Sequence, residues 1–342
     1  MTLRKIVLLD NGDFSFLDFV DKPLGGAQSA FIGLVNGLSK LGCMLEVRNH
    51  CDREFFNEQI AWKRLDYNEK FVCDGFIVNR SAKLLDLVPK GKPVLFWLHN
   101  RGNYLLSPKN LKFLWKSYPT LVFSGQYHRS TFFLWLFFKN RIIPYGLNDV
   151  FFQKNNEKES PSPKAIFTSN PIRSLDWVVD RWIEIKKKVP NAELHVFSGP
   201  SPYGSWGQSV ADRMQIALQY AIERENYGIY VHEPVSKADL IKVIQKSRVM
   251  LYRGDVAETF CLSVAEAMEL GVPCVTMDLG SMKERIESGH NGFVLNTDRD
   301  FVDKAVDLLS NDIMWREFHE RLNQASVNYT WFDVAKKFIK SF

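Results

Sequence analysis

Short apolar runs alternate with amphipathic segments through the first half of the chain. Between the first two runs, residues 27–42 carry apolar side chains at helical spacing and end in Gly42, a residue type that commonly terminates helices. The runs that predict strands are residues 6–9, 45–50, 76–79, 94–98, 121–124 and 142–146. A succession of strand, helix and strand predicts a doubly wound parallel sheet.

A polar stretch at residues 153–163 interrupts this pattern. It contains charged residues, serines and two prolines without apolar periodicity, so it predicts a linker between domains. Beyond it the alternation restarts, with strands predicted at residues 165–169, 193–199, 229–233, 249–253 and 274–277, and helices at about 175–188, 207–225, 237–247 and 263–270. We therefore expect an α/β protein with two Rossmann-like, doubly wound parallel-sheet domains, residues 1–152 and 164–326.

The cysteines and the apolar runs predict where the protein resides. The five cysteines form no Cys-x-x-Cys pair or other metal-ligand spacing, and free thiols are typical of a reducing compartment. The N-terminal apolar run, residues 6–9, is too short for a signal peptide core. The longest apolar run, residues 132–138, is far too short to cross a bilayer. These features predict a cytoplasmic protein that is not integral to a membrane.

The net charge of +5 is unevenly distributed. Residues 1–150 hold 20 Lys and Arg against 13 Asp and Glu, whereas residues 151–342 hold 24 against 26. Between Arg80 and Arg141 there are eleven basic side chains and one acid, with aromatic residues interleaved. This 80–141 stretch is either a solvated basic face or a surface for anionic lipid on the inner face of a membrane. Within it, residues 107–118 fit an amphipathic core helix or a membrane-surface helix.

Two glutamates, Glu258 and Glu266, are the strongest candidates for chemistry. Ser263 and Glu266 have the spacing of a capping box for the helix predicted at 263–270, which explains Glu266 but not Glu258. Glu258 follows a predicted strand, at the sheet edge where open α/β sheets bind ligands. The start of the following helix offers N–H groups and partial positive charge to a phosphate. A carboxylate is useful there if it binds hydroxyls, and a nucleotide sugar carries hydroxyls on both sides of its diphosphate.

Residues 249–295 resemble the signature region of glycosyltransferase family 4, the glycosyl transferases group 1, which are retaining enzymes with the GT-B fold. The two glutamates are separated by seven residues, and Glu-Ala-Met, Gly-Val-Pro and Gly-x-Asn-Gly-Phe-Val runs follow. The resemblance implies that Glu258 contacts the donor sugar and that Glu266 binds the ribose. It implies donor binding by the backbone amides of three residues, Phe260, Cys261 and Leu262.

The resemblance continues outside this region. Residues 165–199 are similar to the first strand, helix and strand of the family's donor lobe, with Arg173 where a lysine is usual. Arg173 is a catalytic candidate because a guanidinium suits phosphate charge, and the alternative is a surface residue. Arg253 is a further donor-binding candidate. The family's fold also implies two domains facing across a cleft and a C-terminal helix, residues 327–342, that crosses back to the first domain.

The first domain adds candidates from one loop and two strand ends. A loop before the first predicted helix resembles the family's Gly-Gly loop, in which the glycines are expected to bind the donor and the next two residues the acceptor; the alternative is a simple turn. The residues of this loop are Gly25, Gly26, Ala27 and Gln28. His99 lies where the family often places a catalytic histidine, and the alternative is a strand-end histidine bonded to backbone. Ser124 is an acceptor-binding candidate of the same kind.

We therefore expect a retaining, metal-independent glycosyltransferase. It would move a sugar from a nucleotide-diphosphate sugar, without a cofactor, to a hydroxyl of a saccharide or lipid-linked acceptor in cell-surface glycan or lipopolysaccharide synthesis. Asp298 and Asp300 imitate a metal-binding Asp-x-Asp motif but stand at the start of a predicted helix, where acids act as caps. The alternatives are a non-catalytic nucleotide-sugar binder and a GT-B epimerase. No RNA-binding signature or zinc spacing indicates a nucleic acid partner.

Overall fold

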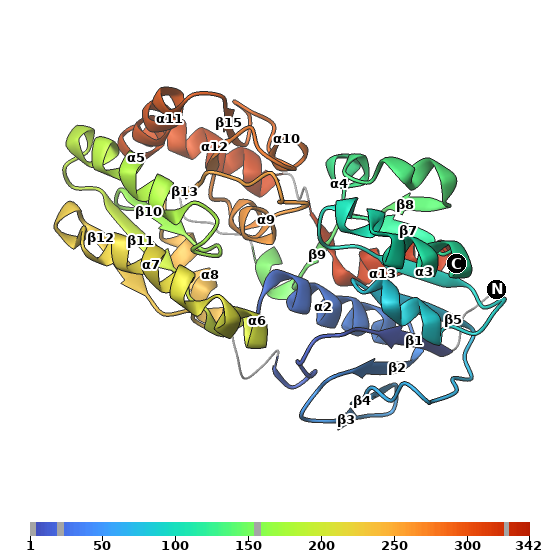
Figure 1. Cartoon of the computed structure of the whole chain (residues 1–342). Coiled ribbons are helices and arrows are strands. Elements are labelled where there is room, and N and C mark those ends of the chain that lie inside the picture. The colour runs from blue at the N-terminus through green and yellow to red at the C-terminus, as the bar shows by residue number, and fades with distance from the viewer. Residues whose placement is uncertain (1–4, 19–23, 154–158, 325–327) are drawn as a thin grey trace. The chain divides into compact units, whose positions relative to one another are not determined.

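The computed structural model describes residues 5–18, 24–153, 159–324 and 328–342, and the chain divides into two compact units (Figure 1). The first unit holds residues 1–148 together with 329–342, and the second holds residues 149–328. Part of the expected linker, residues 154–158, lies outside the described residues.

The described part of the first unit contains an eight-stranded sheet in the order β3-β4-β2-β1-β5-β6-β7-β8. Its neighbouring strands are parallel except for β3 and β4, which are antiparallel. The strands are β1 (Lys5–Leu9), β2 (Met44–Asn49), β3 (Phe55–Phe56), β4 (Ile60–Arg64), β5 (Gly75–Asn79), β6 (Val94–Trp97), β7 (Thr120–Phe123) and β8 (Asn140–Ile142). The strand order reverses direction between β1 and β5, a point at which such sheets bind ligands.

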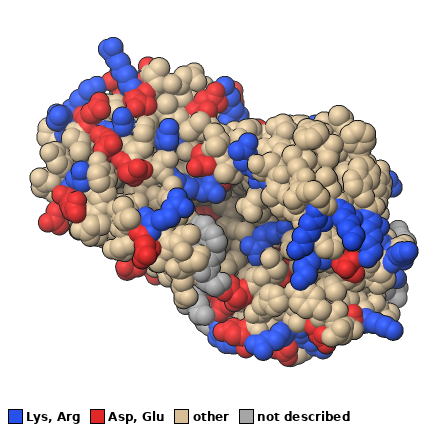
Figure 2. All heavy atoms as spheres, viewed as in Figure 1, with Lys and Arg blue, Asp and Glu red and all other residues tan. Residues whose placement is uncertain are grey.

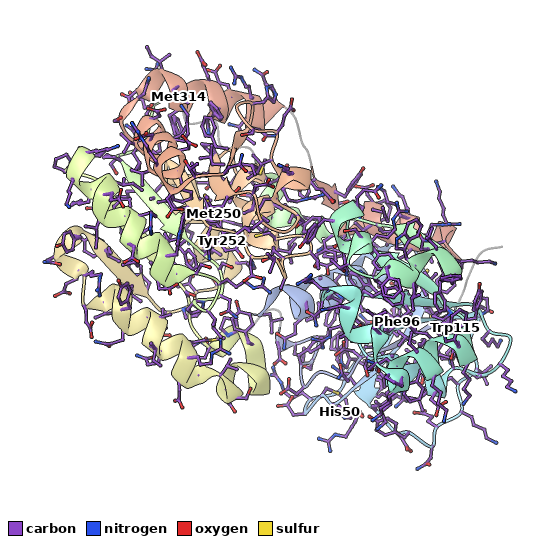
Figure 3. All side chains as sticks on the ribbon, turned by 45° about the horizontal axis from the view of Figure 1, so that its top comes forward. His50, Phe96, Trp115, Met250, Tyr252 and Met314 are labelled. Atoms are coloured by element: carbon purple, nitrogen blue, oxygen red, sulfur yellow. The ribbon has the colours of Figure 1, made fainter. Side chains whose placement is uncertain are left out.

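Helices cover both faces of this sheet. They are α2 (Gly26–Lys40), α3 (Pro108–Ser117), α4 (Gln126–Ser130) and α13 (Trp331–Lys340), with the 3-10 helices η1 (Ala82–Leu87), η2 (Gly102–Leu106) and η3 (Phe133–Phe137). The C-terminal α13 packs on α2, and a Cβ atom at Gly33 would lie 2.2 Å from the Trp331 indole. A glycine at this position therefore lets the indole approach the helix. In Figure 3, Phe96 lies in the interior of the unit and Trp115 on α3.

The described part of the second unit contains a fully parallel six-stranded sheet in the order β12-β11-β10-β13-β14-β15. The strands are β10 (Lys164–Phe167), β11 (Glu193–Phe197), β12 (Ile229–His232), β13 (Val249–Tyr252), β14 (Cys274–Met277) and β15 (Gly292–Leu295). The helices are α5 (Leu175–Lys188), α6 (Gly204–Ser209), α7 (Ala211–Ile222), α8 (Lys237–Gln245), α9 (Leu262–Glu269), α10 (Met282–Arg285), α11 (Asp298–Ser310) and α12 (Asp312–Gln324), with η4 (Asp149–Phe152), η5 (Ser201–Tyr203) and η6 (Glu225–Tyr227). The order reverses between β10 and β13, as in dinucleotide-binding folds.

The expectation of two doubly wound parallel-sheet domains is confirmed, with two local corrections. The strand predicted at 142–146 is divided, because Pro144 has no N–H for a sheet: β8 ends at Ile142, and a separate strand β9 (Gly146–Leu147) pairs with β16 (Tyr329–Thr330). The helix predicted at 207–225 is two helices, α6 and α7, separated at Val210.

Candidate active site

The carboxyl end of β13 presents a group of polar side chains in the second unit. Tyr252 ends the strand and lies in the middle of this unit (Figure 3). Its hydroxyl donates a hydrogen bond of 2.9 Å to Glu258 Oε2. Arg173 Nη1 donates to the same oxygen at 3.1 Å and lies 3.8 Å from Asp255 Oδ1. Arg173 and Glu258, two candidates that are 85 residues apart in sequence, therefore form an ion pair.

The two donors fix one carboxylate oxygen of Glu258. Among the described residues, no hydrogen bond reaches the other oxygen, Oε1. The Glu258 side chain is 16% exposed, so Oε1 can accept a hydroxyl from a bound molecule while Oε2 holds the side chain in place. The backbone of Glu258 packs closely on Gly280, where a Cβ atom would lie only 2.7 Å from Glu258 O, so this position requires a glycine.

Burial and charge set the protonation of the groups around Glu258. Burial, followed by the Glu258 charge, raises the pKa of Tyr252 well above its usual value, so the phenol stays a donor. Burial would lower the pKa of Arg173, but Glu258, Tyr252 and Asp255 outweigh it and raise the pKa. Burial also raises the pKa of Tyr203, which is hydrogen-bonded to Asn170, to about 12. The site therefore combines a permanent cation with neutral phenols.

The start of α9 has an unusual backbone. The residue before the helix, Cys261, is buried and left-handed, with φ of 67°, a conformation that non-glycine residues rarely adopt. The first turn of hydrogen bonds begins with Ala265 N–H donating to Cys261 O, and the amides of Leu262 and Ser263 precede it. Strain of this kind costs about 1–3 kcal/mol and is typical of functional sites.

The capping-box interpretation of Ser263 and Glu266 is wrong. Ser263 lies inside α9, and the residue at the N-cap is Cys261, whose side chain makes no capping hydrogen bond to the described residues. Glu266 instead accepts two hydrogen bonds from Lys237 Nζ, at 2.6 and 2.8 Å, and its side chain is only 7% exposed. Lys237 begins α8 and lies 5.5 Å above the Phe151 ring. Glu266 is therefore held from a second helix rather than by its own.

We expect Lys237→Met to destabilise the second unit by about 2 kcal/mol, because it leaves the buried Glu266 carboxylate without its cation. The double variant Lys237→Met/Glu266→Gln is expected to lose less stability than the two single changes together. Urea unfolding of the four proteins measures this coupling. Strictly additive losses would contradict a direct ion pair.

The remaining second-unit candidates have defined places. Arg253 Nη1 donates to Ser174 Oγ at 3.4 Å, and its guanidinium lies 5.4 Å from the Trp177 ring centroid. Phe260 is buried beneath the Arg285 guanidinium, 4.3 Å from it. Asp298 and Asp300 lie in the first turn of α11, where Thr297 is the cap. The described residues contain no group of three or more His, Cys, Asp or Glu side chains that could hold a metal ion.

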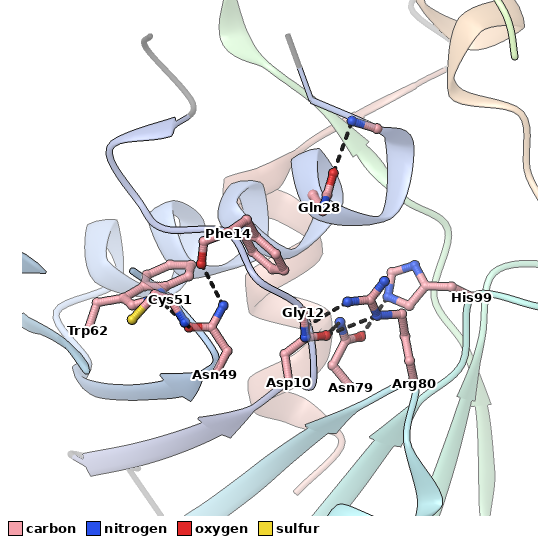
Figure 4. A network of polar contacts seen from close by, with 11 residues as sticks. Asp10, Gly12, Phe14, Gln28, Asn49, Cys51, Trp62, Asn79, Arg80 and His99 are labelled. Atoms are coloured by element: carbon pink, nitrogen blue, oxygen red, sulfur yellow. Dashed lines mark hydrogen bonds and ion pairs between the residues drawn. The ribbon is translucent and has the colours of Figure 1, made fainter. Parts of the chain in front are cut away.

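A buried polar network occupies the switch point of the first unit (Figure 4). Asp10 follows β1 and is fully buried, and Arg80, which follows β5, contacts both of its carboxylate oxygens at 2.6 and 3.0 Å. Asn79 Nδ2 donates to Asp10 Oδ2 at 2.5 Å. Asn79 Oδ1 in turn lies 2.6 Å from His99 Nε2, so the network fixes the orientation of the Asn79 amide.

His99 uses both ring nitrogens inside this unit. Because Asn79 Oδ1 can only accept, His99 Nε2 donates to it, and Nδ1 accepts from the Tyr145 hydroxyl at 2.6 Å. Both of these partners are side chains. Burial, followed by the Arg80 charge, lowers the pKa of His99 well below its usual value. A neutral His99 fits a role in fixing the network.

Ser124 is part of a second buried histidine contact. Its N–H donates to His128 Nδ1 at 3.1 Å, its hydroxyl lies 2.9 Å from the same nitrogen, and His128 Nε2 donates to Asn100 O at 2.8 Å. Burial lowers the pKa of His128 to about 4. Both nitrogens are again used internally.

Acidification is expected to destabilise the first unit. An unfolded histidine takes up a proton near pH 6.5, whereas folded His128 does so near 4, so the unfolded state binds more protons as the pH falls between these values. The free energy of unfolding should drop by at most about 1.4 kcal/mol per pH unit from this residue. Urea titrations of wild type and His128→Asn measure it, with the exposed His50→Asn as control. An unchanged pH slope in His128→Asn would contradict the assignment.

The Gly-Gly loop forms the start of α2. Gly25 is the residue before the helix, and its N–H donates to Gln28 Oε1 at 3.2 Å. Gly26 is exposed, whereas Gln28 is buried. The predicted donor-binding glycines therefore lie at the start of a helix, and the Gln28 side chain caps this helix.

Several residues of these two networks were missed from the sequence. Lys237, Tyr252, Asp255 and Tyr203 belong to the second unit, and Asp10, Asn79 and Arg80 to the first. Position was the available signal for Asp10 and Asn79, because both stand at the carboxyl end of a predicted strand. No pattern in the sequence identifies Lys237 as the partner of Glu266.

Comparison with known proteins supports one reading of this geometry. Residues 163–311 match the family model described as glycosyl transferases group 1. A trehalose synthase of Pyrococcus horikoshii is 24% identical over 164 residues, which are 47% of this chain and 38% of that protein. The match thus spans well under half of this relative.

Solved structures share the fold over nearly the whole chain. The Anabaena protein HepE, in complex with UDP and glucose, matches with a TM-score of 0.72 and 13% identity, covering 99% of each chain. A sucrose-phosphate synthase from Thermosynechococcus elongatus matches with a TM-score of 0.74 and 12% identity, covering 98% of this chain and 97% of that one. The chain therefore has the GT-B fold, and its residues 163–311 match the glycosyl transferases group 1 model.

Proposed function

We propose that the protein is a retaining, metal-independent glycosyltransferase that uses a nucleotide-diphosphate sugar. The observation that carries the proposal is the joint fixing of Glu258 by Tyr252 and Arg173 at the switch-point edge of the parallel sheet, next to the start of α9. The family match of residues 163–311 and the UDP in the HepE complex support a nucleotide-sugar donor.

In this mechanism the diphosphate leaves as the anomeric C–O bond breaks. Arg173 and the amides at the start of α9 stabilise the charge that develops on the phosphate. Among the described residues, the ion pairs of Arg173 with Glu258 and Asp255 use Nη1, so Nη2 and Nε can face the phosphate. Glu258 Oε1 accepts a sugar hydroxyl, and Glu266, held by Lys237, accepts hydroxyls of the ribose.

Retention follows if the acceptor attacks the face that the phosphate leaves. The acceptor hydroxyl oxygen bonds to the anomeric carbon, and its proton passes to the leaving phosphate oxygen. This route needs no protein base, which agrees with the internal use of both nitrogens of His99. We assign the acceptor, a saccharide or lipid-linked alcohol for glycan or lipopolysaccharide synthesis in the cytoplasm, to the first unit near Ala27. The alternatives are a non-catalytic nucleotide-sugar binder and a GT-B epimerase.

Thermal stabilisation by UDP, GDP, ADP and their sugars tests the donor site. A bound nucleotide stabilises the folded state by RT ln(1 + [L]/Kd) and so raises the melting temperature, and Glu266→Ala is expected to lose this shift. Glu269→Ala, on the same helix, is the matched control, since Glu269 pairs with Asn328 instead. The absence of a shift with every nucleotide, or an equal shift in Glu266→Ala, would contradict the assigned site. Product formation separates a transferase from a binder or an epimerase.

A further inference from the structure

Five large apolar side chains stand on the outside of the first unit. They come from the end of α3 and from η3, and each is between 50% and 70% exposed. We call this group the apolar patch; its members are Trp115, Tyr118, Phe133, Leu136 and Phe137. Contiguous exposed apolar groups of this size commonly mark an interaction surface.

The patch is one continuous surface from two segments. The Trp115 and Phe137 rings are 6.4 Å apart, and the Tyr118 hydroxyl donates to Phe137 O at 2.6 Å. Beneath them, Trp115 lies 4.9 Å from the ring of Phe138, which is buried. The contact between α3 and η3 therefore brings apolar residues more than 15 positions apart together at the surface.

The residues around η3 show why its apolar side chains are not needed inside. Phe132 and Phe138 flank the helix, and both are buried in the hydrophobic core. They anchor η3 at its two ends, while Phe133, Leu136 and Phe137 point outward. Trp135 is covered by the Arg129 guanidinium, 4.2 Å from its ring. The first unit thus holds η3 in place at both ends while it exposes three of its apolar side chains.

Positive charge accompanies the patch. The sequence from residue 87 to residue 148 contains no Asp or Glu. The exposed basic residues of this segment that are close in sequence to the members of the apolar patch are Lys109, Lys112, Lys116, Lys139 and Arg141. The acid that precedes this segment, Asp86, is paired with Lys116. Figure 2 shows Lys and Arg side chains gathered on the first unit beside a broad uncharged area.

We infer that the apolar patch docks on an anionic lipid bilayer. Its Phe and Leu side chains enter the boundary between headgroups and acyl chains, and Trp115 and Tyr118 lie at headgroup depth, where such rings are favoured. The lysines face the anionic headgroups. A lipid surface fits better than a protein partner because the acid-free segment is matched to a broad, uniformly negative surface. The part of the chain that the structure describes contains no helix with the length and hydropathy of a membrane span.

The test is sedimentation with vesicles of phosphatidylcholine, alone or mixed equally with phosphatidylglycerol. We expect binding to the mixed vesicles and at least about tenfold weaker binding to phosphatidylcholine alone, because each lysine near an anionic surface contributes about fivefold. The variant Phe133→Ser/Leu136→Ser/Phe137→Ser removes three apolar side chains whose exposed surface would be buried in the bilayer. It should weaken binding about 100-fold. The control variant Val72→Ser/Ile216→Ser/Ile313→Ser changes three apolar residues elsewhere that are at least as exposed on average.

The outcomes are distinct. Loss of binding in the η3 variant, with binding retained in the control, supports the bilayer. Equal binding of the two variants, or no binding of wild type to either vesicle, overturns it. A wild-type dimer in light scattering that the η3 variant abolishes also overturns it, because a second copy would then cover the patch. Circular dichroism checks that the variants fold. Nucleotide binding is measured separately, so failure here leaves the proposed transfer reaction untouched.

Discussion

Glu258→Gln is expected to lower the rate of sugar transfer by about a thousandfold while the protein stays folded. Glutamine has nearly the same shape but lacks the negative charge that Arg173 Nη1 and the Tyr252 hydroxyl bind. It would also offer a sugar hydroxyl a weaker acceptor or a wrongly placed NH₂ group. Initial rates at saturating donor, with circular dichroism as the folding check, measure the effect.

A matched variant separates the charge of Glu258 from its positioning. Tyr252→Phe keeps the charge and the buried ring but removes one of the two donors to Oε2, so transfer should fall only about tenfold. Glu287→Gln, an exposed change in the same unit, should leave transfer unaltered. Near-wild-type turnover of Glu258→Gln would remove this residue from the mechanism.

The architecture could be predicted because strand and helix periodicity is local. β14 (Cys274–Met277) and α5 (Leu175–Lys188) have the bounds that their patterns indicated. The error at 142–146 also has a local cause. Its apolar residues fit a strand, but Pro144 prevents continuous pairing, so the pattern alone overestimated the length.

The site could be predicted only in part, because its contacts join distant segments. Glu258 and Glu266 were recognised from their spacing, yet the partners that orient them come from β13 and from the start of α8. The capping-box spacing of Ser263 was misleading, since a left-handed Cys261 starts the helix one residue earlier. Periodicity contains no information on such tertiary pairs.

The apolar run at 132–138 shows the same limit. From the sequence it could be judged only as too short to cross a bilayer. In the structure its two end residues are buried and three middle ones are exposed, because η3 makes a tight turn between them. The exposed surface arises from this alternation together with the contact to α3.

Arg173→Met is expected to lower kcat for transfer by about a hundredfold to a thousandfold, with a smaller change in KM for the donor. The guanidinium is the fixed cation proposed to meet the charge that develops on the leaving phosphate, so its loss should act mainly on the transition state. It also releases Glu258 Oε2 from one of its two donors. Steady-state kinetics with varied donor separates kcat from KM.

Arg173→Lys distinguishes geometry from charge. A lysine keeps the charge but cannot bind Glu258 and a phosphate with a planar fork, so kcat should recover only in part. Arg181→Met, on the neighbouring helix α5 and paired with Asp298, is the control and should transfer sugar normally. Combining Arg173→Met with Glu258→Gln should cost less than the product of the two single effects, because the residues act as one unit. Full multiplicativity, or an unchanged kcat in Arg173→Met, would show that the ion pair is structural and that the leaving phosphate is stabilised by other groups.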